Sequence, residues 1–272
     1  MLMAERRRLI LEHVRRRGVV SMRDMADLLG TSEITVRRDL TALAGEGLVQ
    51  RTHGGAVLPH GLAHEPTYRE KATQAAAEKA AIARLAVELV QPGDSIVLGA
   101  GTTTLALARE LRAIPELTVV TNSLLVAEAL MDSSGIELLL TGGTLRRSIH
   151  ALVGPPAEQS LRGLRASLAF LSGNGLTAQR GLSTPNLLVA ATDRALAAAA
   201  RRIVVLADYT KIGRDTMCQT VPSAAIQALI TDPRADEDEI RLIREAGIEV
   251  RVASPAEAPE DEWIEAPAIP AG

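Results

Sequence analysis

The chain has 272 residues, which is enough for two domains or one large domain with an ample core. A formal net charge of −3 excludes a surface coated throughout for nucleic acid, and four aromatic residues argue against recognition of single-stranded RNA or DNA, which usually needs several stacking platforms. The single cysteine, Cys218, excludes an internal disulfide framework and is interpreted as a passive small side chain. With no secretory or membrane-spanning pattern, we expect a cytoplasmic protein.

The charge is distributed unevenly along the chain. Residues 1–57 hold ten arginines against seven acidic residues, whereas acidic residues outnumber basic ones in the remainder. A small basic part joined to an acidic body is typical of a DNA-binding module fused to a domain that does not bind DNA. The predicted organisation is a head at 1–58, a linker at 59–72, a body at 73–254 and a disordered tail at 255–272, where alanine, proline and glutamate dominate.

The head begins with two helix patterns. Residues 4–16 carry spaced aliphatic side chains, and we expect this helix to bury them and to turn Arg6-Arg7-Arg8 outward. Ser21 is a suitable N-cap for a second helix at 22–29, which Gly30 ends. Because a third helix with an exposed cap follows after a short turn, this arrangement predicts a helix-turn-helix.

The third helix is the segment around which the head is organised. Thr31 and Ser32 are N-cap residue types, and the helix is expected to continue to about Glu46. Its expected inward residues are Val36, Leu40 and Leu43, and its expected outward residues are Ile34, Arg38 and Thr41. An isoleucine beside an arginine suits a DNA major groove, where the first can contact a thymine methyl and the second can pair with guanine.

Two short apolar runs after this helix predict a hairpin, or wing, around His53-Gly54-Gly55. Thr35 and Arg37 flank the outward face of the helix, where phosphates would lie. Asp39 turns toward the core, where we expect it to hold a neighbouring arginine or a backbone donor. The residues predicted to contact double-stranded DNA are Ser32, Ile34, Thr35, Arg37, Arg38, Thr41 and His53.

The body alternates short apolar runs with helix-length segments, starting with an alanine-rich helix at 73–90. Buried-looking runs separated by helices predict a parallel sheet and an α/β fold. The seven candidate strands are 95–98, 117–120, 137–140, 168–171, 202–206, 228–230 and 248–252.

Small hydroxyl residues and glycines follow the first four candidate strands. In open α/β sheets, ligands bind beyond the carboxyl ends of the strands, and the free N–H groups of helix starts favour an anion. We therefore expect one shared pocket for a phosphate, with Lys211 adding a cation to its rim. The predicted ligand-binding residues are Gly101, Thr102, Thr103, Asn122, Ser123, Gly142, Gly143, Gly173, Asn174, Gly175 and Lys211.

Dense motifs in the head carry a family resemblance. The head resembles the winged helix-turn-helix of DeoR-type bacterial transcriptional regulators through Ser32-Glu33-Ile34-Thr35-Val36-Arg37-Arg38-Asp39-Leu40, Gly47-Leu48-Val49 and Arg51-Thr52-His53-Gly54-Gly55-Ala56. This resemblance implies binding of operator DNA, usually to repress a gene cluster for sugar or nucleoside catabolism.

The body resembles the sensor domain of the same family over nearly all of its length. The matching segments are Gly101-Thr102-Thr103, Thr121-Asn122-Ser123, Gly142-Gly143, Gly173-Asn174-Gly175 and Asp208-Tyr209-Thr210-Lys211-Ile212-Gly213. That domain is similar in fold to ribose-5-phosphate isomerase and glucosamine-6-phosphate deaminase, which implies a phosphorylated, sugar-like effector. The chain departs from the family at Gly99, where an acidic residue is common, and at Ala191 and Asp193, where a glutamate and a lysine are common. The expectation of a phosphate therefore survives better than that of any named sugar.

Two classes of function fit this organisation. The first is a repressor that binds operator DNA as a homo-oligomer, because helix-turn-helix proteins usually dimerise to span two half-sites. The sequence leaves open whether a sugar or polyol phosphate would release or promote DNA binding. The second is a sugar-phosphate isomerase or deaminase, which would need a general base and a further acid or histidine. The one histidine of the body is His150, and Asp208 is the one acidic candidate at the pocket turns.

Other chemistry finds no pattern in the chain. The spacing of cysteine and histidine fits no zinc site, and the Gly-x-Ser-x-Gly elbow of serine hydrolases does not occur. We therefore predict no metal, no cofactor and no catalytic residue, and favour the regulator over the enzyme.

Overall fold

The computed structural model describes residues 2–17, 19–46, 48–52, 54–57 and 65–254. Within these residues, the buried apolar side chains of the head form a cluster with no member from the body, and the clusters of the body have no member from the head. Each part therefore has a core of its own. The predicted tail and residues 59–64 of the predicted linker lie outside the described residues.

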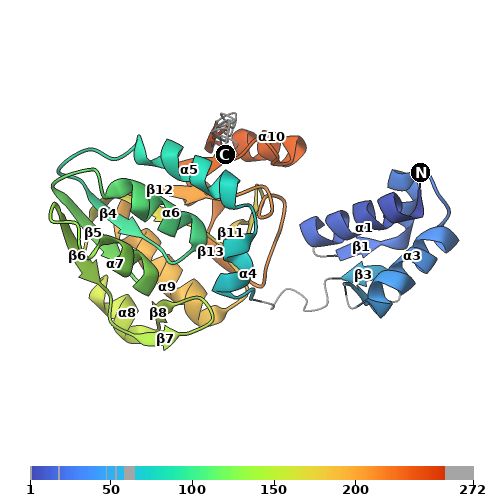
Figure 1. The fold of residues 1–272 in the computed structure, drawn as a ribbon, viewed down its shortest axis with the longest axis horizontal. Coiled ribbons are helices and arrows are strands. Elements are labelled where there is room, and N and C mark those ends of the chain that lie inside the picture. The colour runs from blue at the N-terminus through green and yellow to red at the C-terminus, as the bar shows by residue number, and fades with distance from the viewer. Residues whose placement is uncertain (1, 18, 47, 53, 58–64, 255–272) are drawn as a thin grey trace, which may run out of the picture.

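Helices and a small antiparallel sheet make up the head (Figure 1). Its described elements are α1 (Met3–Arg17), β1 (Val19–Ser21), α2 (Met22–Leu29), α3 (Glu33–Gly45), β2 (Gln50–Arg51) and β3 (Gly55–Val57). The strands lie in the order β1-β3-β2. This arrangement confirms the predicted helix-turn-helix and wing, and it adds β1, which the sequence did not predict.

Local hydrogen bonds fix the ends of α2 and the start of α3. Ser21 Oγ accepts a hydrogen bond from the N–H of Asp24 at 3.0 Å, and Gly30 ends α2 in the left-handed conformation, with φ of 59°. Ser32 Oγ accepts from the N–H of Thr35 at 3.3 Å. The bounds of α2 match the prediction because both of its ends carry residues whose chemistry stops a helix.

The wing is attached to the helices through a glycine that tolerates no side chain. A Cβ on Gly55 would lie 1.8 Å from the carbonyl oxygen of Val20. Gly55 stands opposite Ser21 in the ladder between β1 and β3, so the two strands pair at close range. The wing is thereby joined through β1 to the start of α2.

Two arginines of α1 differ from the prediction. Arg6 Nε lies 2.6 Å from one carboxylate oxygen of Asp39, and Arg7 Nε lies 3.0 Å from the other. The prediction that Arg6-Arg7-Arg8 all face solvent is therefore wrong for the first two, because a buried carboxylate needs cationic partners. Arg8 does lie on the exposed side, where it pairs with Glu12 at 2.7 Å. The predicted structural role of Asp39 is confirmed.

The body is built on a seven-stranded parallel sheet, which confirms the predicted α/β fold class. Every candidate strand of the sequence belongs to it, and the strand order is β15-β14-β12-β9-β4-β5-β6. Its strands are β4 (Ser95–Leu98), β5 (Leu117–Thr121), β6 (Ile136–Leu140), β9 (Ala166–Leu171), β12 (Ala200–Leu206), β14 (Ala228–Thr231) and β15 (Glu249–Val252).

Helices cover both faces of this sheet. The described helices of the body are α4 (Tyr68–Thr73), α5 (Ala76–Val87), α6 (Thr102–Leu111), α7 (Leu124–Leu130), α8 (Pro155–Ser160), α9 (Leu187–Ala198), α10 (Glu237–Glu245) and the 3-10 turn η1 (Ser223–Ala225). Ile96 and Leu98 of β4 pack in one cluster with α5, α6 and α7, whereas Val97 packs in a second cluster with α9 and α10. Because both faces are buried, the strands are continuous apolar runs, which is why the sequence revealed them.

The sequence missed two small antiparallel sheets and one helix. The first sheet pairs β7 (Thr144–Arg146) with β8 (Ala151–Val153), and the second has the order β10-β11-β13, formed by β10 (Gly175–Thr177), β11 (Gly181–Thr184) and β13 (Cys218–Val221). These strands are too short to show a sustained alternation. The helix is α4, which lies in the predicted linker except for its last residue, Thr73. Across the described residues, no helix has both the length and the apolar character needed to cross a membrane.

Candidate functional site

The outward face of α3, formed by Ile34, Arg37, Arg38 and Thr41, is exposed. Ile34 is 68% exposed, and within the described chain neither arginine of this face forms an ion pair. On the opposite side of α3, Val36, Leu40 and Leu43 are buried, as the periodicity predicted. A large apolar side chain and two free guanidinium groups therefore point away from the core.

The hydroxyl groups of α3 are partly used within the helix itself. Ser32 Oγ and Thr35 Oγ1 lie 3.0 Å apart, so both contribute to the N-terminal cap. Thr41 Oγ1 donates to the carbonyl oxygen of Arg37 at 2.7 Å. His53 lies outside the described residues. DNA contact by Ser32, Thr35, Thr41 and His53 stays a prediction, as it does for the rest of the outward face.

The inward side of α3 is fixed by charge as well as by packing. Asp39 is 2% exposed, and its two oxygens are bound by the arginines of α1. Hydrogen bonds that join two ionised groups are stronger than neutral ones. The pair of contacts therefore holds α3 against α1 and fixes the direction of the outward face.

In the body, the chain changes direction between β4 and β9. The strands β4, β5 and β6 follow one another toward one edge of the sheet, whereas β9, β12, β14 and β15 run toward the other. In an open α/β sheet, such a switch point leaves a crevice beyond the carboxyl ends of the two central strands. Five of the predicted residues lie in the turns at this point: Gly101, Thr102, Thr103, Gly173 and Asn174.

A small cavity of about 30 Å³ lies at this switch point. Segments far apart in sequence line it, including the start of α6, the turn after β9, α4, α5, α9 and the segment after β12. Its charged residues are Glu65, Lys71, Lys79, Asp193, Asp208 and Lys211. The cavity thus brings together six of the predicted ligand-binding residues, Lys211 among them.

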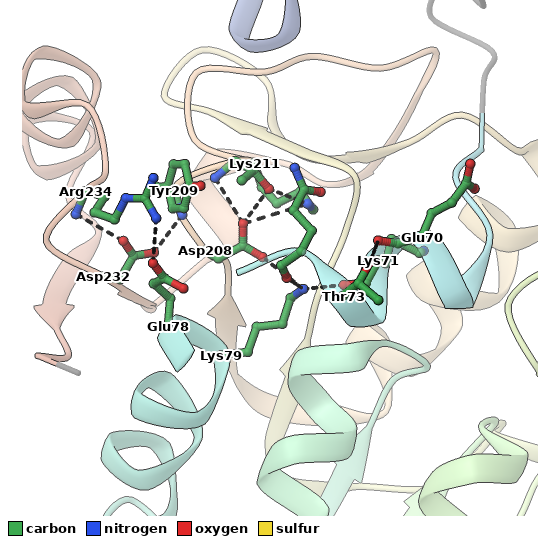
Figure 2. A network of polar contacts seen from close by, with 12 residues as sticks. Glu70, Lys71, Thr73, Glu78, Lys79, Asp208, Tyr209, Lys211, Asp232 and Arg234 are labelled. Carbon is green, nitrogen blue, oxygen red and sulfur yellow. Dashed lines mark hydrogen bonds and ion pairs between the residues drawn. The ribbon is translucent and has the colours of Figure 1, made fainter. Parts of the chain in front are cut away.

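Two lysines of the cavity approach Asp208 from different elements (Figure 2). Lys79 Nζ lies 3.8 Å from Asp208 Oδ2, and Lys211 Nζ lies 3.8 Å from Asp208 Oδ1. Thr210 donates to Oδ1 through its backbone N–H at 3.0 Å and through its hydroxyl group, which itself accepts from Lys211 Nζ at 2.5 Å. Asp208 therefore holds the ammonium groups of Lys79 and Lys211 on one side of the cavity.

Lys79 also joins α5 to α4. Its Nζ donates to the carbonyl oxygen of Lys71 at 2.5 Å and to that of Gln74 (Figure 2). These carbonyl groups lie at the C-terminal end of α4, where a helix has no internal donors for them. The ammonium group of Lys79 thus serves both the helix end and the cavity.

The segment that enters α4 is held by a second set of contacts. Glu65 accepts from Arg146 Nε at 2.6 Å and from Ser148 Oγ at 3.0 Å, so it is tied to β7 and the turn after it. The N–H of Tyr68 donates to the carbonyl oxygen of Ser148 at 2.7 Å. The start of α4 is therefore anchored by polar contacts at the same cavity that its Lys71 lines.

Burial changes the protonation of the groups that line the cavity. It lowers the pKa of Lys71 and Lys79, and it lowers that of Lys211 to about 8. Burial also raises the pKa of Asp193 to about 7, against the opposing effect of Lys71. Asp193 is therefore partly protonated at neutral pH, and Lys211 loses its proton at a lower pH than a lysine in water.

Five predicted residues lie outside the lining of this cavity. Asn122 Oδ1 accepts from the N–H of Ala100 at 3.0 Å and its Nδ2 donates to the carbonyl oxygen of Leu152 at 3.1 Å. Ser123 Oγ caps α7 by accepting from Val126. The side chain of Asn122 thus holds two neighbouring segments together, and that of Ser123 caps its own helix; neither lines the cavity, and their role in ligand binding stays a prediction.

The three remaining glycines occupy tight backbone positions. A Cβ on Gly143 would lie 2.8 Å from the carbonyl oxygen of Val153, and a Cβ on Gly175 would lie 2.2 Å from that of Arg214. Gly142 follows β6, the edge strand of the sheet, and both β4 and β5 lie between β6 and β9. From the sequence we assigned these turns to one pocket, because the sequence alone does not give the order of the strands in the sheet.

Sequence reasoning did not assign Glu65, Lys71, Lys79 or Asp193 to the cavity, and it considered Asp193 only as a departure from the family. One signal was present for Lys79, since a lysine amid the alanines of a helix is out of place on a face that packs against a sheet. In the described residues, histidine, cysteine, aspartate and glutamate side chains nowhere gather in threes to hold a metal ion.

Comparisons with known proteins match both parts of the chain. Residues 6–61 match the model of the DeoR-like helix-turn-helix domain, and residues 74–233 match that of the DeoR C terminal sensor domain. The chain is 36% identical to a putative aga operon transcriptional repressor of Escherichia coli O157:H7, over 91% of this chain and 93% of that protein. It is 32% identical to the glycerol-3-phosphate regulon repressor of Escherichia coli K12, over 82% of this chain and 88% of that protein.

Among solved structures, ribose 5-phosphate isomerase A from Methanocaldococcus jannaschii aligns with 49% of this chain and 52% of that chain, at 21% identity and a TM-score of 0.37.

Proposed function

Because this chain belongs to the DeoR family of transcriptional regulators, we propose that it represses a carbohydrate or nucleoside catabolic operon by binding operator DNA through α3. A phosphorylated, sugar-like effector bound in the cavity of the body controls this binding. The observation that carries the proposal is the outward face of α3, which is exposed and forms no ion pair among the described residues. The ion pairs of Asp39 hold the opposite side of this helix against α1. The chain is a regulator rather than the isomerase or deaminase that formed the alternative.

The chemistry of the outward face supports recognition of base pairs. Ile34 offers an aliphatic surface to a thymine methyl group, and Arg38 offers two parallel donors to guanine. Arg37, at the edge of this face, would neutralise a phosphate, which adds affinity for any sequence. A regulator that binds operator DNA acts in the compartment that holds this DNA, so we expect the protein in the cytoplasm.

Operator binding in the expected form requires two heads. A single α3 reads only a few base pairs, and helix-turn-helix proteins reach specificity by placing two such helices about one turn of DNA apart. We therefore expect a homodimer or a higher oligomer with paired half-sites. Analytical ultracentrifugation of the full chain, with and without DNA, measures this directly.

The cavity supports an anionic effector. The first N–H groups of α6 start at Thr102 and Thr103, where a helix favours negative charge, and three lysines line the same space. The relative named for the glycerol-3-phosphate regulon is consistent with a small phosphorylated metabolite here. A volume of about 30 Å³ has room for a water molecule or two, so a sugar phosphate requires side chains to move aside.

That movement gives a route from the cavity to the head. Lys79 donates to carbonyl oxygens at the end of α4, and a phosphate in the cavity would compete for the same ammonium group. Since α4 follows the segment that leads to the head, a change in its contacts would alter the freedom of the head. The effector can control DNA binding only to the extent that it binds the two arrangements with different affinity.

The test is DNA binding by the full chain, measured by fluorescence anisotropy on the DNA upstream of its neighbouring genes. We expect a preference for that DNA over unrelated duplex and an affinity that falls steeply as salt rises. Addition of sugar and polyol phosphates should shift the midpoint in one consistent direction. An affinity that does not change with ionic strength and is the same for all DNA sequences would overturn the proposal.

A further inference from the structure

Asp193 is a buried carboxylate without a partner. It is 8% exposed and lines the cavity, yet no hydrogen bond or ion pair within 4 Å joins it to any residue in the described part of the chain. Buried carboxylates are normally paired, because an unpaired one loses the water that would solvate its charge. The carboxyl group of Asp193 is therefore available to bind a ligand that enters the cavity.

The position of Asp193 is set by the helix that carries it. Asn186 Oδ1 caps α9 by accepting from the N–H of Val189 at 3.1 Å. Val189 and Asp193 are one turn apart on the same side of α9, and both line the cavity. The carboxyl group therefore faces the cavity because the packed face of the helix turns it there.

The other charges of the cavity are arranged differently. Asp208 is engaged by Lys79, Lys211 and Thr210, and Glu65 is engaged by Arg146 and Ser148. Lys71 lines the cavity without an ion pair within the described residues. One ammonium group and one carboxyl group are thus left for a ligand, beside the N-terminus of α6.

These two free groups limit the chemistry of the ligand. Lys71 and the start of α6 attract an anion such as a phosphate, whereas Asp193 needs a hydrogen-bond donor. An ammonium group on the ligand would bring a second positive charge beside Lys71, which forms no ion pair among the described residues. A hydroxyl group donates to a carboxylate without adding positive charge.

We propose that Asp193 selects the effector, by accepting hydrogen bonds from hydroxyl groups on the part of the ligand remote from its phosphate. Polyol and sugar phosphates satisfy this requirement, and alkyl phosphates of the same length do not. The proposal rests on the proposed function, because it assigns a role to a residue of the same effector cavity.

Near neutral pH, the protonation of Asp193 becomes part of its selectivity. Burial raises its pKa to about 7, and the charged groups that face it are Lys71 on α4, Arg194 on α9 and Glu65 before α4. The ionised carboxylate accepts hydroxyl donors more strongly than the protonated acid. Ligand hydroxyl groups therefore favour the ionised form, and their contribution to affinity should grow as pH rises through about 7.

The test compares matched probes on the full chain by isothermal titration calorimetry. The pairs are glycerol 3-phosphate with n-propyl phosphate and erythritol 4-phosphate with n-butyl phosphate. Hydrogen bonds to charged groups are worth about 10- to 100-fold in affinity, so we expect the wild type to prefer the polyol of at least one pair by about that factor. This preference should shrink at pH 6 and grow at pH 8.

Variants of Asp193 isolate its contribution. Asp193→Asn should reduce the preference to within about threefold and remove its pH dependence, and Asp193→Leu should abolish it while alkyl phosphate still binds. Asp132→Asn, which changes an exposed carboxyl group after α7, is the matched control and should behave as the wild type.

The outcomes separate the two proposals. If phosphates bind but the wild type shows no preference for polyols, or if both Asp193 variants keep that preference, the role of Asp193 is overturned while the effector cavity stands. If neither these probes nor inorganic phosphate binds the wild type, the proposed effector cavity fails and the role of Asp193 fails with it.

Discussion

The head and the body place their unpaired charges in opposite environments. In the head, the buried Asp39 is fully paired, and the free arginines of α3 stand on the surface. In the body, a lysine and a carboxylate whose side chains form no hydrogen bond or ion pair among the described residues line a cavity. An exposed guanidinium group keeps its water, whereas a buried carboxylate without a partner is costly. The buried charge of the head is therefore already paired within the chain, whereas the proposed effector would supply partners for the unpaired groups of the body.

The two sites also differ in how they are assembled. The outward face of α3 comes from one helix of 13 residues, so its geometry follows from helical periodicity. The cavity comes from segments as far apart as Lys71 and Lys211, so its geometry follows from strand order. Surfaces built from one element can be inferred locally, and sites built from many cannot.

The largest expected effect tests whether the two cores are independent. Phe170 is fully buried in the body, and Phe170→Ala should lower the stability of the body by about 3–5 kcal/mol, because it removes buried area and leaves a cavity. Leu40→Ala in the head is the counterpart. Differential scanning calorimetry should show each variant moving one transition and leaving the other. Joint movement of both transitions in either variant would remove the distinction between the cores.

The next effect concerns the unpaired carboxyl group of the body. The pKa of Asp193 is about 7 in the folded chain and near its ordinary 3.8 when unfolded, so the folded state keeps a proton that the unfolded state has released between these values. The stability of the wild type should therefore fall as pH rises from about 4 to 7 and then stay level. Asp193→Asn should lack this loss and be more stable by about 2–4 kcal/mol at pH 8.

Urea unfolding of the body transition at pH 5 and pH 8 measures this difference. Asp132→Asn again serves as the control. Equal pH dependence in the wild type and in Asp193→Asn would mean that Asp193 is paired in solution, and the contrast between the two regions would no longer hold.

The smallest effect separates two neighbouring arginines of the head. Arg38→Ala should weaken binding to the preferred DNA by about 10- to 100-fold and leave unrelated DNA nearly unaffected, because it removes a base contact. Arg37→Ala should weaken both alike and reduce the salt dependence by about one unit of slope. Anisotropy titrations at several salt concentrations measure both quantities, with the exposed body variant Arg112→Ala as control. Wild-type discrimination in both variants would show that the outward face is assigned wrongly.

Sequence patterns predicted those features that depend on neighbouring residues. The inward face of α3 and the strands of the main sheet were found because Val36, Leu40 and the apolar runs repeat with the period of their own element. The pairing of Arg6 with Asp39 was missed, because the two are separated by 33 positions and no local rule brings them together.

The cavity of the body shows the same limit more clearly. Turns after β4 and β9 line it and those after β5 and β6 do not, since only the first two flank the switch point. Strand order is a property of the whole sheet, so glycine and hydroxyl residues looked alike in all four turns. Lys71 was hidden for another reason, because its helix lay in a segment predicted to be a linker.

Gly55 has a consequence for genetics. Because a side chain there would collide with the backbone of Val20, almost any missense change at this codon should separate the wing from β1. A screen for loss of repression would then return two kinds of allele: those in α3 that yield a folded protein blind to its operator, and those at Gly55 that yield a damaged head. Because the body folds around its own cores, both kinds of subunit would still join wild-type partners if the proposed oligomer assembles through the body, and both should then be dominant over the wild-type gene.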